Sequence, residues 1–345
     1  MQSQTKPLLN LSLEELTDLV LKLGEKKFRA EQLYLWLNKG VPFSGMRNLP
    51  ESFLTRLKAE TTEGYAEILN RQVSKDGTTK YLLGFADGVS VEAVLMKQSY
   101  GNTLCISTQA GCRMACAFCA SGALGLQRNL LAGEILAEVL AAVTDGNTVN
   151  NLVLMGMGEP FDNYDNVVKF LKLVNHPKGL NIGMRSISLS TCGLVPGIIA
   201  FADEGLPATL AISLHAPNDA IRRQIMPIAK TYTMGEVLDA AKYYFNKTGR
   251  RVIIEYVLID GINASAENAA ELAGRLRGFN CHVNLIPYNA VGGDFKAPNK
   301  AAVEAFRQTL EKNKVGATVR KTSGDDIDGA CGQLRLKHMN SKQGK

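Results

Sequence analysis

The sequence predicts an α/β protein: a partial (β/α)6 barrel preceded by a small helical domain and an antiparallel β linker. Two changes of pattern predict this. From Leu104 onward, apolar β-rich runs alternate with helical patterns, which is typical of a parallel sheet covered by helices. Between Ala66 and Met96 the hydrophobic period is two, which is typical of antiparallel strands. Six strand-helix units are too few to close the eight-fold barrel, so we expect an open, curved sheet.

Helical patterns dominate the first 62 residues. Ser12-Leu13-Glu14-Glu15 has the pattern of a capping box, and Gly24 is placed to end the helix that it opens. Two more helices are predicted, one near Arg29 to Lys39 and one after Pro50. This region is rich in basic side chains: Lys22, Lys26, Lys27, Arg29, Lys39, Arg47, Arg56 and Lys58. They could meet phosphates, or they could simply be solvated helix faces.

The antiparallel segment contains two turn signals. Asp76-Gly77 and Asp87-Gly88 lie between apolar runs, as hairpin turns do. The run that follows the second turn alternates polar and apolar residues, with Ser90 and Glu92 at the polar positions. From this alternation alone we expect Glu92 to be an exposed strand residue.

The barrel region contains strand and helix patterns in alternation. The predicted strands are Leu104 to Ser107, Asn151 to Met155, Ser186 to Ser190, Thr209 to Leu214, Val252 to Leu258 and His282 to Ile286. The predicted helices are Gly133 to Val143, Tyr164 to Val174, Pro196 to Asp203, Met234 to Phe245, Glu267 to Leu276 and Lys300 to Lys314. We therefore divide the chain into a helical accessory domain (1–62), an antiparallel extension (63–103), the barrel with its C-terminal segment (104–334) and a basic tail (335–345).

Composition places the chain among ordinary globular proteins. With 345 residues, 46% of them hydrophobic, it can bury a large core. Met1 to Asn10 lacks the pattern of a signal peptide, and the apolar runs are too short for a membrane span, so we expect no membrane association and a cytoplasmic location. Seven cysteines, an odd number, argue against a secreted disulfide framework. The net charge of +6 is compatible with an RNA partner but is shared by many enzymes.

Three cysteines stand close together in Gly111-Cys112-Arg113-Met114-Ala115-Cys116-Ala117-Phe118-Cys119. Three thiolates on one tight loop suit a corner of an iron-sulfur cube better than a tetrahedral zinc, because no further Cys or His follows until His176. A cluster with three protein ligands keeps one iron open for another ligand. The alternative is three buried structural thiols, which three cysteines within eight positions make improbable.

Unusual residues gather where the predicted strands end. The second strand is followed by Gly156-Met157-Gly158-Glu159-Pro160, whose glycines allow a close approach of backbone to a ligand. Because the strand ends of such a barrel form the active-site rim, these residues predict a binding site for a cofactor with polar groups. The candidates are Gly158, Glu159, Ser190, Ser213, Leu214, His215 and Asn289. The serines could also be simple strand terminators, and His215 a loop histidine with satisfied hydrogen bonds.

Several of these stretches together resemble one family. The chain from about Leu104 to Leu334 is similar to the radical S-adenosylmethionine (SAM) RNA methyltransferases that act on adenosine, the RlmN/Cfr family. The matching stretches are Cys105 to Cys112, the GMGEP segment, Ser213 to Asn218, Asn284 to Asn289 and Arg320 to Leu334. The last is the most diagnostic, since other radical SAM enzymes lack it. Pro160 and the LIPYN segment resemble the RlmN branch, which methylates adenine C2, more than the Cfr branch, which methylates C8.

The resemblance implies a barrel of the radical SAM type and a chemistry for named residues. Cys112, Cys116 and Cys119 would hold one 4Fe-4S cluster, and two SAM molecules would be used per turnover. Cys331 would carry the methyl group as S-methylcysteine, and Cys105 would resolve the RNA-protein link through a transient disulfide with Cys331. Glu92 would be the proton acceptor, a role that replaces its exposed-strand interpretation. Cys192 and Cys281 match no step, and we interpret both as structural.

The resemblance also implies substrates and partners. They are an adenosine of large-subunit ribosomal RNA near the peptidyl transferase centre, the adenosine 3′ of the anticodon in some transfer RNAs, and a cellular electron donor, with the protein acting as a monomer. Arg320, Lys321, Arg335 and Lys337 bracket Cys331 and could contact phosphates. Two alternatives stay open: a C8-methylating enzyme of the Cfr type, and a non-catalytic iron-sulfur protein that binds RNA or carries electrons.

Overall fold

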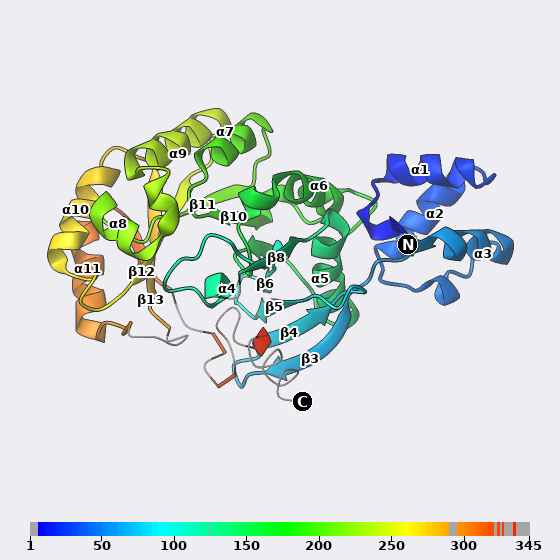
Figure 1. Cartoon of the computed structure of the whole chain (residues 1–345), viewed down its shortest axis with the longest axis horizontal. Coiled ribbons are helices and arrows are strands. Elements are labelled where there is room, and N and C mark those ends of the chain that lie inside the picture. The colour runs from blue at the N-terminus through cyan, green and yellow to red at the C-terminus, as the bar shows by residue number, and fades with distance from the viewer. Residues whose placement is uncertain are drawn as a thin grey trace.

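A ten-stranded sheet forms the backbone of the molecule. The computed structural model describes residues 6–123, 125–289, 295–320, 323–324, 326–327 and 334–335. The strand order in the sheet is β14-β13-β12-β11-β10-β9-β6-β5-β4-β3. Within this sheet, β6 and the strands from β9 to β14 run parallel to one another, and β3, β4 and β5 extend the sheet beyond β6 as antiparallel strands. Figure 1 shows the parallel strands as an arc with helices outside it and the extension (cyan) at one end.

The parallel part follows the predicted alternation closely. Its strands are β6 (Thr103–Cys105), β9 (Asn151–Leu154), β10 (Ile187–Thr191), β11 (Thr209–Ser213), β12 (Val252–Leu258) and β13 (Cys281–Pro287). Its helices are α5 (Ala132–Thr144), α6 (Tyr164–Asn175), α7 (Val195–Asp203), α9 (Met234–Thr248), α10 (Ala266–Leu276) and α11 (Lys300–Lys312). The prediction of a partial (β/α) barrel is confirmed in its order and in its open form.

Short elements escaped prediction. These are β1 (Lys6–Pro7), β2 (Thr61–Thr62), β7 (Gln109–Gly111), α4 (Ala120–Ala123), β8 (Leu126–Asn129), α8 (Asp219–Ile225) and β14 (Ala317–Val319). Each is too short to show a hydrophobic period. The parallel strand β14 pairs with β13 and adds a seventh parallel strand to the six predicted ones within the described residues.

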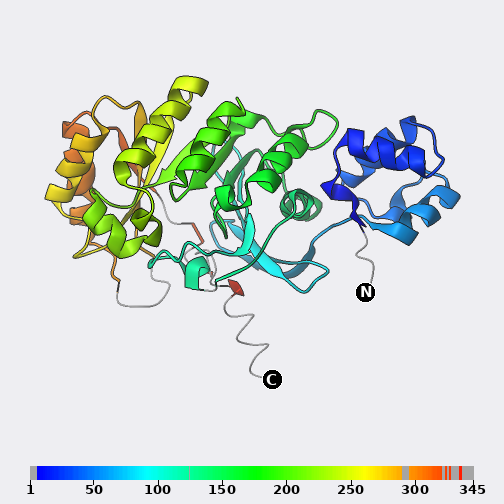
Figure 2. The same cartoon turned by 45° about the horizontal axis from the view of Figure 1, so that its top comes forward.

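Helices α1 (Leu13–Lys22), α2 (Phe28–Leu37) and α3 (Glu51–Glu60) form the N-terminal domain. Figures 1 and 2 both place it at one side of the barrel. The predicted capping box is present, because Ser12 Oγ accepts from the Glu15 amide and the Glu15 carboxylate accepts from the Ser12 amide. The Asn10 side chain accepts a hydrogen bond from the Gly133 amide at the start of α5, which fixes this domain against the barrel.

The extension consists of β3 (Glu67–Val73), β4 (Thr79–Gly84) and β5 (Ser90–Met96), with turns at the two predicted Asp-Gly pairs. One face of β4 and β5 packs into the main core through Tyr81, Leu83, Val91 and Ala93. The opposite face is buried too, and it carries Glu92, which is only 3% exposed. The expectation of an exposed Glu92 was therefore wrong, because both faces of this strand are covered.

No helix of the described residues combines the length and the apolar character that a membrane span needs.

Candidate functional site

One cavity opens at the carboxyl ends of the parallel strands. The cysteine loop and the strand ends, with the segments that follow them, line this cavity. The residues of the loop are Cys112, Met114, Cys116, Phe118, Cys119 and Ala120. The other lining residues are Leu154, Met155, Gly156, Gly158, Glu159, Ser190, Cys192, Ser213, His215, Met226, Glu255, Val257, Ile286, Tyr288, Asn289 and Arg320. The loop and the strand ends, predicted separately to be functional, thus share one site. The expectation for Cys192 changes, since this buried thiol lines the cavity.

The cysteine loop is anchored at both ends by the hairpin of β7 and β8. The amide of Cys112 donates to the carbonyl of Gly125 at 3.1 Å. Gly111 has a φ of +88°, and a Cβ there would lie 1.8 Å from the same carbonyl, so only glycine fits at this position. The loop between these anchors is closed by backbone contacts, which hold the thiols at the cavity.

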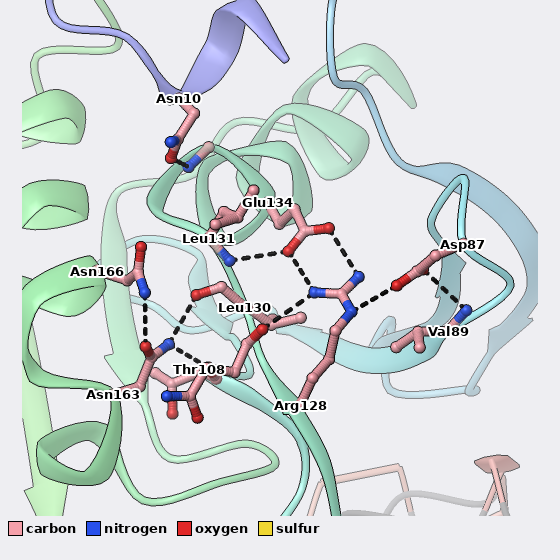
Figure 3. A network of polar contacts seen from close by, with 12 residues as sticks. Asn10, Asp87, Val89, Thr108, Arg128, Leu130, Leu131, Glu134, Asn163 and Asn166 are labelled. Atoms are coloured by element: carbon pink, nitrogen blue, oxygen red, sulfur yellow. Dashed lines mark hydrogen bonds and ion pairs between the residues drawn. The ribbon is translucent and has the colours of Figure 1, made fainter. Parts of the chain in front are cut away.

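Arg128 on β8 ties this hairpin to the rest of the molecule (Figure 3). Its guanidinium makes two hydrogen bonds to the Glu134 carboxylate at the start of α5, at 2.7 and 2.8 Å, and one to Asp87 at 2.5 Å. Behind it, the Asn163 side chain donates to the carbonyls of Thr108 and Leu130. The cysteine loop therefore rests on a support shared by the barrel and the β extension.

The three thiols of the loop line one cavity, and three cysteine thiolates are a ligand set typical of an iron-sulfur cluster. Burial raises the pKa of Cys112 and of Cys116 to about 12, so iron binding would have to displace their protons.

The glycine loop after β9 brings backbone to the cavity wall. Gly158 has a φ of +102°, and a Cβ there would lie 2.7 Å from the amide nitrogen of Gln109. The Glu159 carboxylate accepts hydrogen bonds from the amides of Cys192, at 2.7 Å, and Phe161, at 3.1 Å. Burial raises the pKa of Glu159, although these hydrogen bonds act in the opposite direction. The Glu159 side chain thus holds the strand ends together, and backbone groups of this loop lie next to it at the cavity.

The next strand ends supply small polar groups. Ser190 and Ser213 lie side by side with their hydroxyls 3.1 Å apart. His215 Nδ1 accepts a hydrogen bond from the Val257 amide, and burial lowers its pKa to about 3. The ring is therefore neutral at pH 7 with its hydrogen on Nε2, which makes it a fixed donor. Leu214 differs from the other candidates: it packs in the core and does not line the cavity.

Arg222, on helix α8, which the sequence did not predict, fixes the carboxyl ends of β10 and β11. Its buried guanidinium donates to the carbonyls of Cys192, at 2.6 Å, and Leu214, at 3.2 Å. It also contributes, after burial, to the lowered pKa of His215. The carbonyls at the ends of β10 and β11 are therefore fixed by one side chain.

Glu255 is a site residue that sequence reasoning missed. It lies on β12 opposite Ser213, is 3% exposed and lines the cavity. One carboxylate oxygen accepts from the Asn284 side chain at 3.0 Å, and the other has no hydrogen-bond partner among the residues that the structure describes. Burial raises its pKa, an effect that Arg320 opposes. A charged residue inside an otherwise apolar strand was the available signal, since such a carboxylate needs a partner.

A second group of residues lies on the face of β4, β5 and β6 that is turned away from the main core. Val94 pairs with Cys105 across β5 and β6, so Glu92 and Cys105 lie on the same face of the sheet. Lys80 on β4 completes the group, with its ammonium 3.0 Å from Glu92 Oε2. Cys105 is also the register partner of Val153 on β9, next to Leu154 of the cavity wall. Cys331 lies outside the described residues.

Two clamps hold the described parts of the C-terminal segment. At the turn between β3 and β4, Asp76 accepts from the Gly324 amide at 3.0 Å, and Asp326 accepts from the Ser74 hydroxyl and from the Lys75 amide. Farther along, the Arg335 amide donates to Glu92 Oε1 at 2.7 Å, and its guanidinium donates to Gln127. Figure 1 shows residues 334–335 as the red turn beside β4.

Comparison with known proteins finds related sequences over nearly the whole chain. Residues 106–273 match the model of the Radical SAM superfamily, and residues 6–62 match that of the Ribosomal RNA large subunit methyltransferase N-terminal domain. A protein of Clostridium perfringens strain SM101, named "Probable dual-specificity RNA methyltransferase RlmN", is 49% identical over 98% of this chain and 99% of its own. A relative of the same name from Symbiobacterium thermophilum is 48% identical over 99% of this chain and 94% of its own.

One solved structure is similar over the whole fold. The crystal structure of a radical SAM methyltransferase from Sphaerobacter thermophilus superposes with a TM-score of 0.92 at 41% identity, covering 95% of this chain and 98% of that one.

Proposed function

The chain belongs to the RlmN family of radical SAM RNA methyltransferases, and from that premise we propose that it methylates C2 of adenosine in both ribosomal and transfer RNA. The targets would be an adenosine of large-subunit ribosomal RNA near the peptidyl transferase centre and the adenosine 3′ of the anticodon in a subset of transfer RNAs. The words "dual-specificity" in the names of the relatives support two RNA classes. A non-catalytic iron-sulfur protein is not compatible with this family.

The superfamily uses a 4Fe-4S cluster and SAM, and the three cysteines of the loop fit the cluster. When bound, the cluster and SAM would supply the one-electron chemistry that an electron-poor carbon such as adenine C2 requires. The protein would hold the cluster through Cys112, Cys116 and Cys119. Gly158, Glu159, Ser190, Ser213, His215 and Asn289 would orient SAM, with Leu214 limited to its backbone.

The remaining steps fall to protein side chains. The Cys331 sulfur would first accept a methyl group from one SAM. After this methyl group loses a hydrogen atom to the radical derived from the second SAM, its carbon would add to C2 and join RNA and protein by a thioether, and the unpaired electron would return to the cluster. Glu92 would take the proton from C2. The Cys105 thiolate would then attack the Cys331 sulfur and form a disulfide, while the carbon keeps the electron pair of the broken carbon-sulfur bond and takes up a proton to become the methyl group of the product. A cellular reductant would reset the disulfide. Two SAM molecules per turnover follow from this scheme, one for the methyl and one for the radical.

The observation that carries the proposal is that Glu92 and Cys105, which lie on different strands, share one buried sheet face beside a cavity-lining strand. A proton acceptor and a resolving thiol must reach the same reacting carbon and sulfur. The tether of Arg335 to Glu92 supports the same scheme, since it brings the chain that follows Cys331 to this face.

The proposal is tested by expressing this protein in a host that lacks its own enzyme and mapping adenosine modifications in both RNA classes by nuclease digestion and mass spectrometry. We expect 2-methyladenosine in both. A product of 8-methyladenosine would overturn the choice of C2, and product in ribosomal RNA alone would overturn the dual specificity.

The carrier role is tested separately with Cys331→Ala and Cys105→Ala. The first variant should keep the visible absorption of the cluster and yield no methylated RNA. The second should accumulate RNA covalently attached to protein, because the thioether forms and is not cleaved. Methylation by Cys331→Ala would disprove the protein-bound methyl group. Finding free RNA alone, with native yield, for Cys105→Ala would disprove the resolving role.

A further inference from the structure

Lys80 is a fully buried lysine that no catalytic step above uses. Its side chain is 0% exposed, and that of its ion-pair partner Glu92 is 2% exposed. It lies two residues before Leu82, which pairs with Glu92 across β4 and β5, so the two charged side chains meet diagonally on one sheet face. A buried ammonium is rare in strands, because its removal from water costs several kcal/mol.

The Glu92 carboxylate is held from two sides. Lys80 Nζ lies 3.0 Å from Oε2, while the backbone amide of Arg335 donates to Oε1 at 2.7 Å. The backbone is held as well, because the Ser107 hydroxyl donates to the Glu92 carbonyl at 2.8 Å. These two contacts, one at each carboxylate oxygen, fix the plane of the carboxylate.

Stability alone gives no reason for this pair. A buried ion pair is worth no more than well-packed apolar residues of the same volume, and often less. The apolar residues that such a strand face would normally carry are present next to it, at Leu82 and Val94. What the ammonium provides, and an apolar side chain cannot, is a directed, charge-assisted contact that orients the Glu92 carboxylate.

We propose that Lys80 is a positioning residue for the reaction: through its ion pair it fixes the direction in which Glu92 accepts the proton from adenine C2. The inference rests on the proposed proton-accepting role of Glu92. Lys80 itself touches neither RNA nor cofactor in this scheme. Through Glu92 it also supports the amide contact to Arg335, and thus the position of the chain that follows Cys331.

The charges around Glu92 come from several elements. Besides Lys80 on β4, they include the Arg335 guanidinium on the C-terminal segment, which interacts with Glu92 electrostatically. The Cys105 thiol lies on the same face of β6, and the Glu138 carboxyl of α5 accepts from the Ser107 amide behind the strand. Of these groups, Lys80 is the cation that forms an ion pair with Glu92 in which both side chains are buried.

The test compares Lys80→Met, Lys80→Arg and Glu92→Gln with Lys97→Met, which makes the same substitution at an exposed lysine of the same hairpin. Each cluster-loaded protein is assayed for methylation of RNA, for covalent RNA-protein adduct and for the rate of product release. Unloaded proteins are assayed by hydrogen exchange at the Arg335 amide. Thermal unfolding reports whether each variant is folded.

We expect Lys80→Met to form product at least tenfold more slowly and to accumulate the adduct, because Glu92 loses the contact that orients it. Exchange at the Arg335 amide should be at least tenfold faster in Lys80→Met and in Glu92→Gln. Lys80→Arg should restore product release and the amide protection, and Lys97→Met should match the native protein.

Three results would overturn the inference. One is native product release by Lys80→Met. Another is an equal loss of product release in Lys80→Met and Lys80→Arg, which would mean a packing role only. If Lys80→Met does not fold, native protection of the Arg335 amide in Glu92→Gln would overturn it. Normal methylation by Glu92→Gln is a different failure, since it removes the proton-accepting role of Glu92 and not the contacts of Lys80.

Discussion

The two halves of the proposed site are assembled in different ways. The cofactor half takes its three thiols from the eight positions Cys112 to Cys119, on one loop closed by its own hairpin. The second half takes Lys80, Glu92 and Cys105 from three neighbouring strands and the Arg335 amide from a position 243 residues after Glu92. Local backbone geometry fixes the first half, and strand register with long-range docking fixes the second.

This difference has a physical consequence for mutation. A change in the cysteine loop removes ligands directly and leaves the sheet intact. In the β extension, a slip of one residue in the pairing of β4 and β5 would turn Lys80 and Glu92 to the opposite face. The second half should therefore respond to changes that lie far from its reacting groups, whereas the first half should not.

The largest effect is expected for Cys112→Ala. Loss of one of three thiolates should abolish the visible absorption of the reconstituted cluster and reduce methylation below detection, because the one-electron chemistry has no other source. Thermal unfolding of the unloaded protein should change little, since the β extension and the barrel core remain. Cys281→Ala is the matched control, as this cysteine lies at the amino end of β13. Cluster absorption at the native level in Cys112→Ala would refute the assignment.

Next in size is the effect expected for Glu255→Ala, compared with Glu138→Ala. Both carboxyls are buried, and within the described part of the chain each has one oxygen without a hydrogen-bond partner; of the two, Glu255 lines the cavity and Glu138 does not. We expect Glu255→Ala to weaken SAM binding about tenfold to a hundredfold, the value of one or two buried polar contacts, with a nearly native melting temperature. Glu138→Ala should instead lower the melting temperature, because the Ser107 amide loses its acceptor.

Equilibrium dialysis with SAM and thermal unfolding separate these outcomes. Native SAM affinity in Glu255→Ala would show that its free oxygen does not face the cofactor.

The contrast between the halves also explains what the sequence could predict. The cysteine loop, the strand-helix alternation and the Asp-Gly turns at 76 and 87 have local signals, and the structure has the predicted elements there. The burial of Glu92 has no local signal. An alternation of polar and apolar residues predicts a strand with one face in water. The face of β5 that carries Glu92 is instead covered, and Leu82, Val94 and Arg335 are buried there. Lys80 lies in a largely apolar run, and this position was the available signal of a buried partner for Glu92, as the position of Glu255 was on β12.

A smaller effect is expected where the two halves are joined, at Arg128. Arg128→Gln removes the bonds from β8 to Glu134 and Asp87. The Arg128 side chain is 28% exposed, so we expect a loss of about 1–3 kcal/mol in the free energy of unfolding, as for hydrogen bonds to charged groups. Arg113→Gln is the control: its pair with Asp162 is more exposed, and its loss should cost at most about 1 kcal/mol. Urea unfolding measures both, and equal losses would show that Arg128 is no special support.

The smallest effect is expected for Asp76→Asn, at the clamp on the C-terminal segment. Hydrogen bonds from the amides of Gly324 and Thr78 hold the pKa of Asp76 well below its usual range. A lowered pKa in the folded state means that this group stabilises the protein above the ordinary Asp value near 3.9 and that the effect fades as the pH falls below it. Asp76→Asn should therefore lower the melting temperature by roughly 1–2 °C at pH 7, and less at pH 3.

Because the same clamp holds Gly324 seven residues before Cys331, methylation by Asp76→Asn should fall by a small factor while cluster absorption stays native. Asp239→Asn, at an exposed helical ion pair, is the control for the charge change. A drop in melting temperature that is equal at pH 7 and pH 3 would mean that the amide bonds to Asp76 do not depend on its charge. Loss of cluster absorption in Asp76→Asn would contradict the independence of the two halves, since no described contact joins this turn to the cysteine loop.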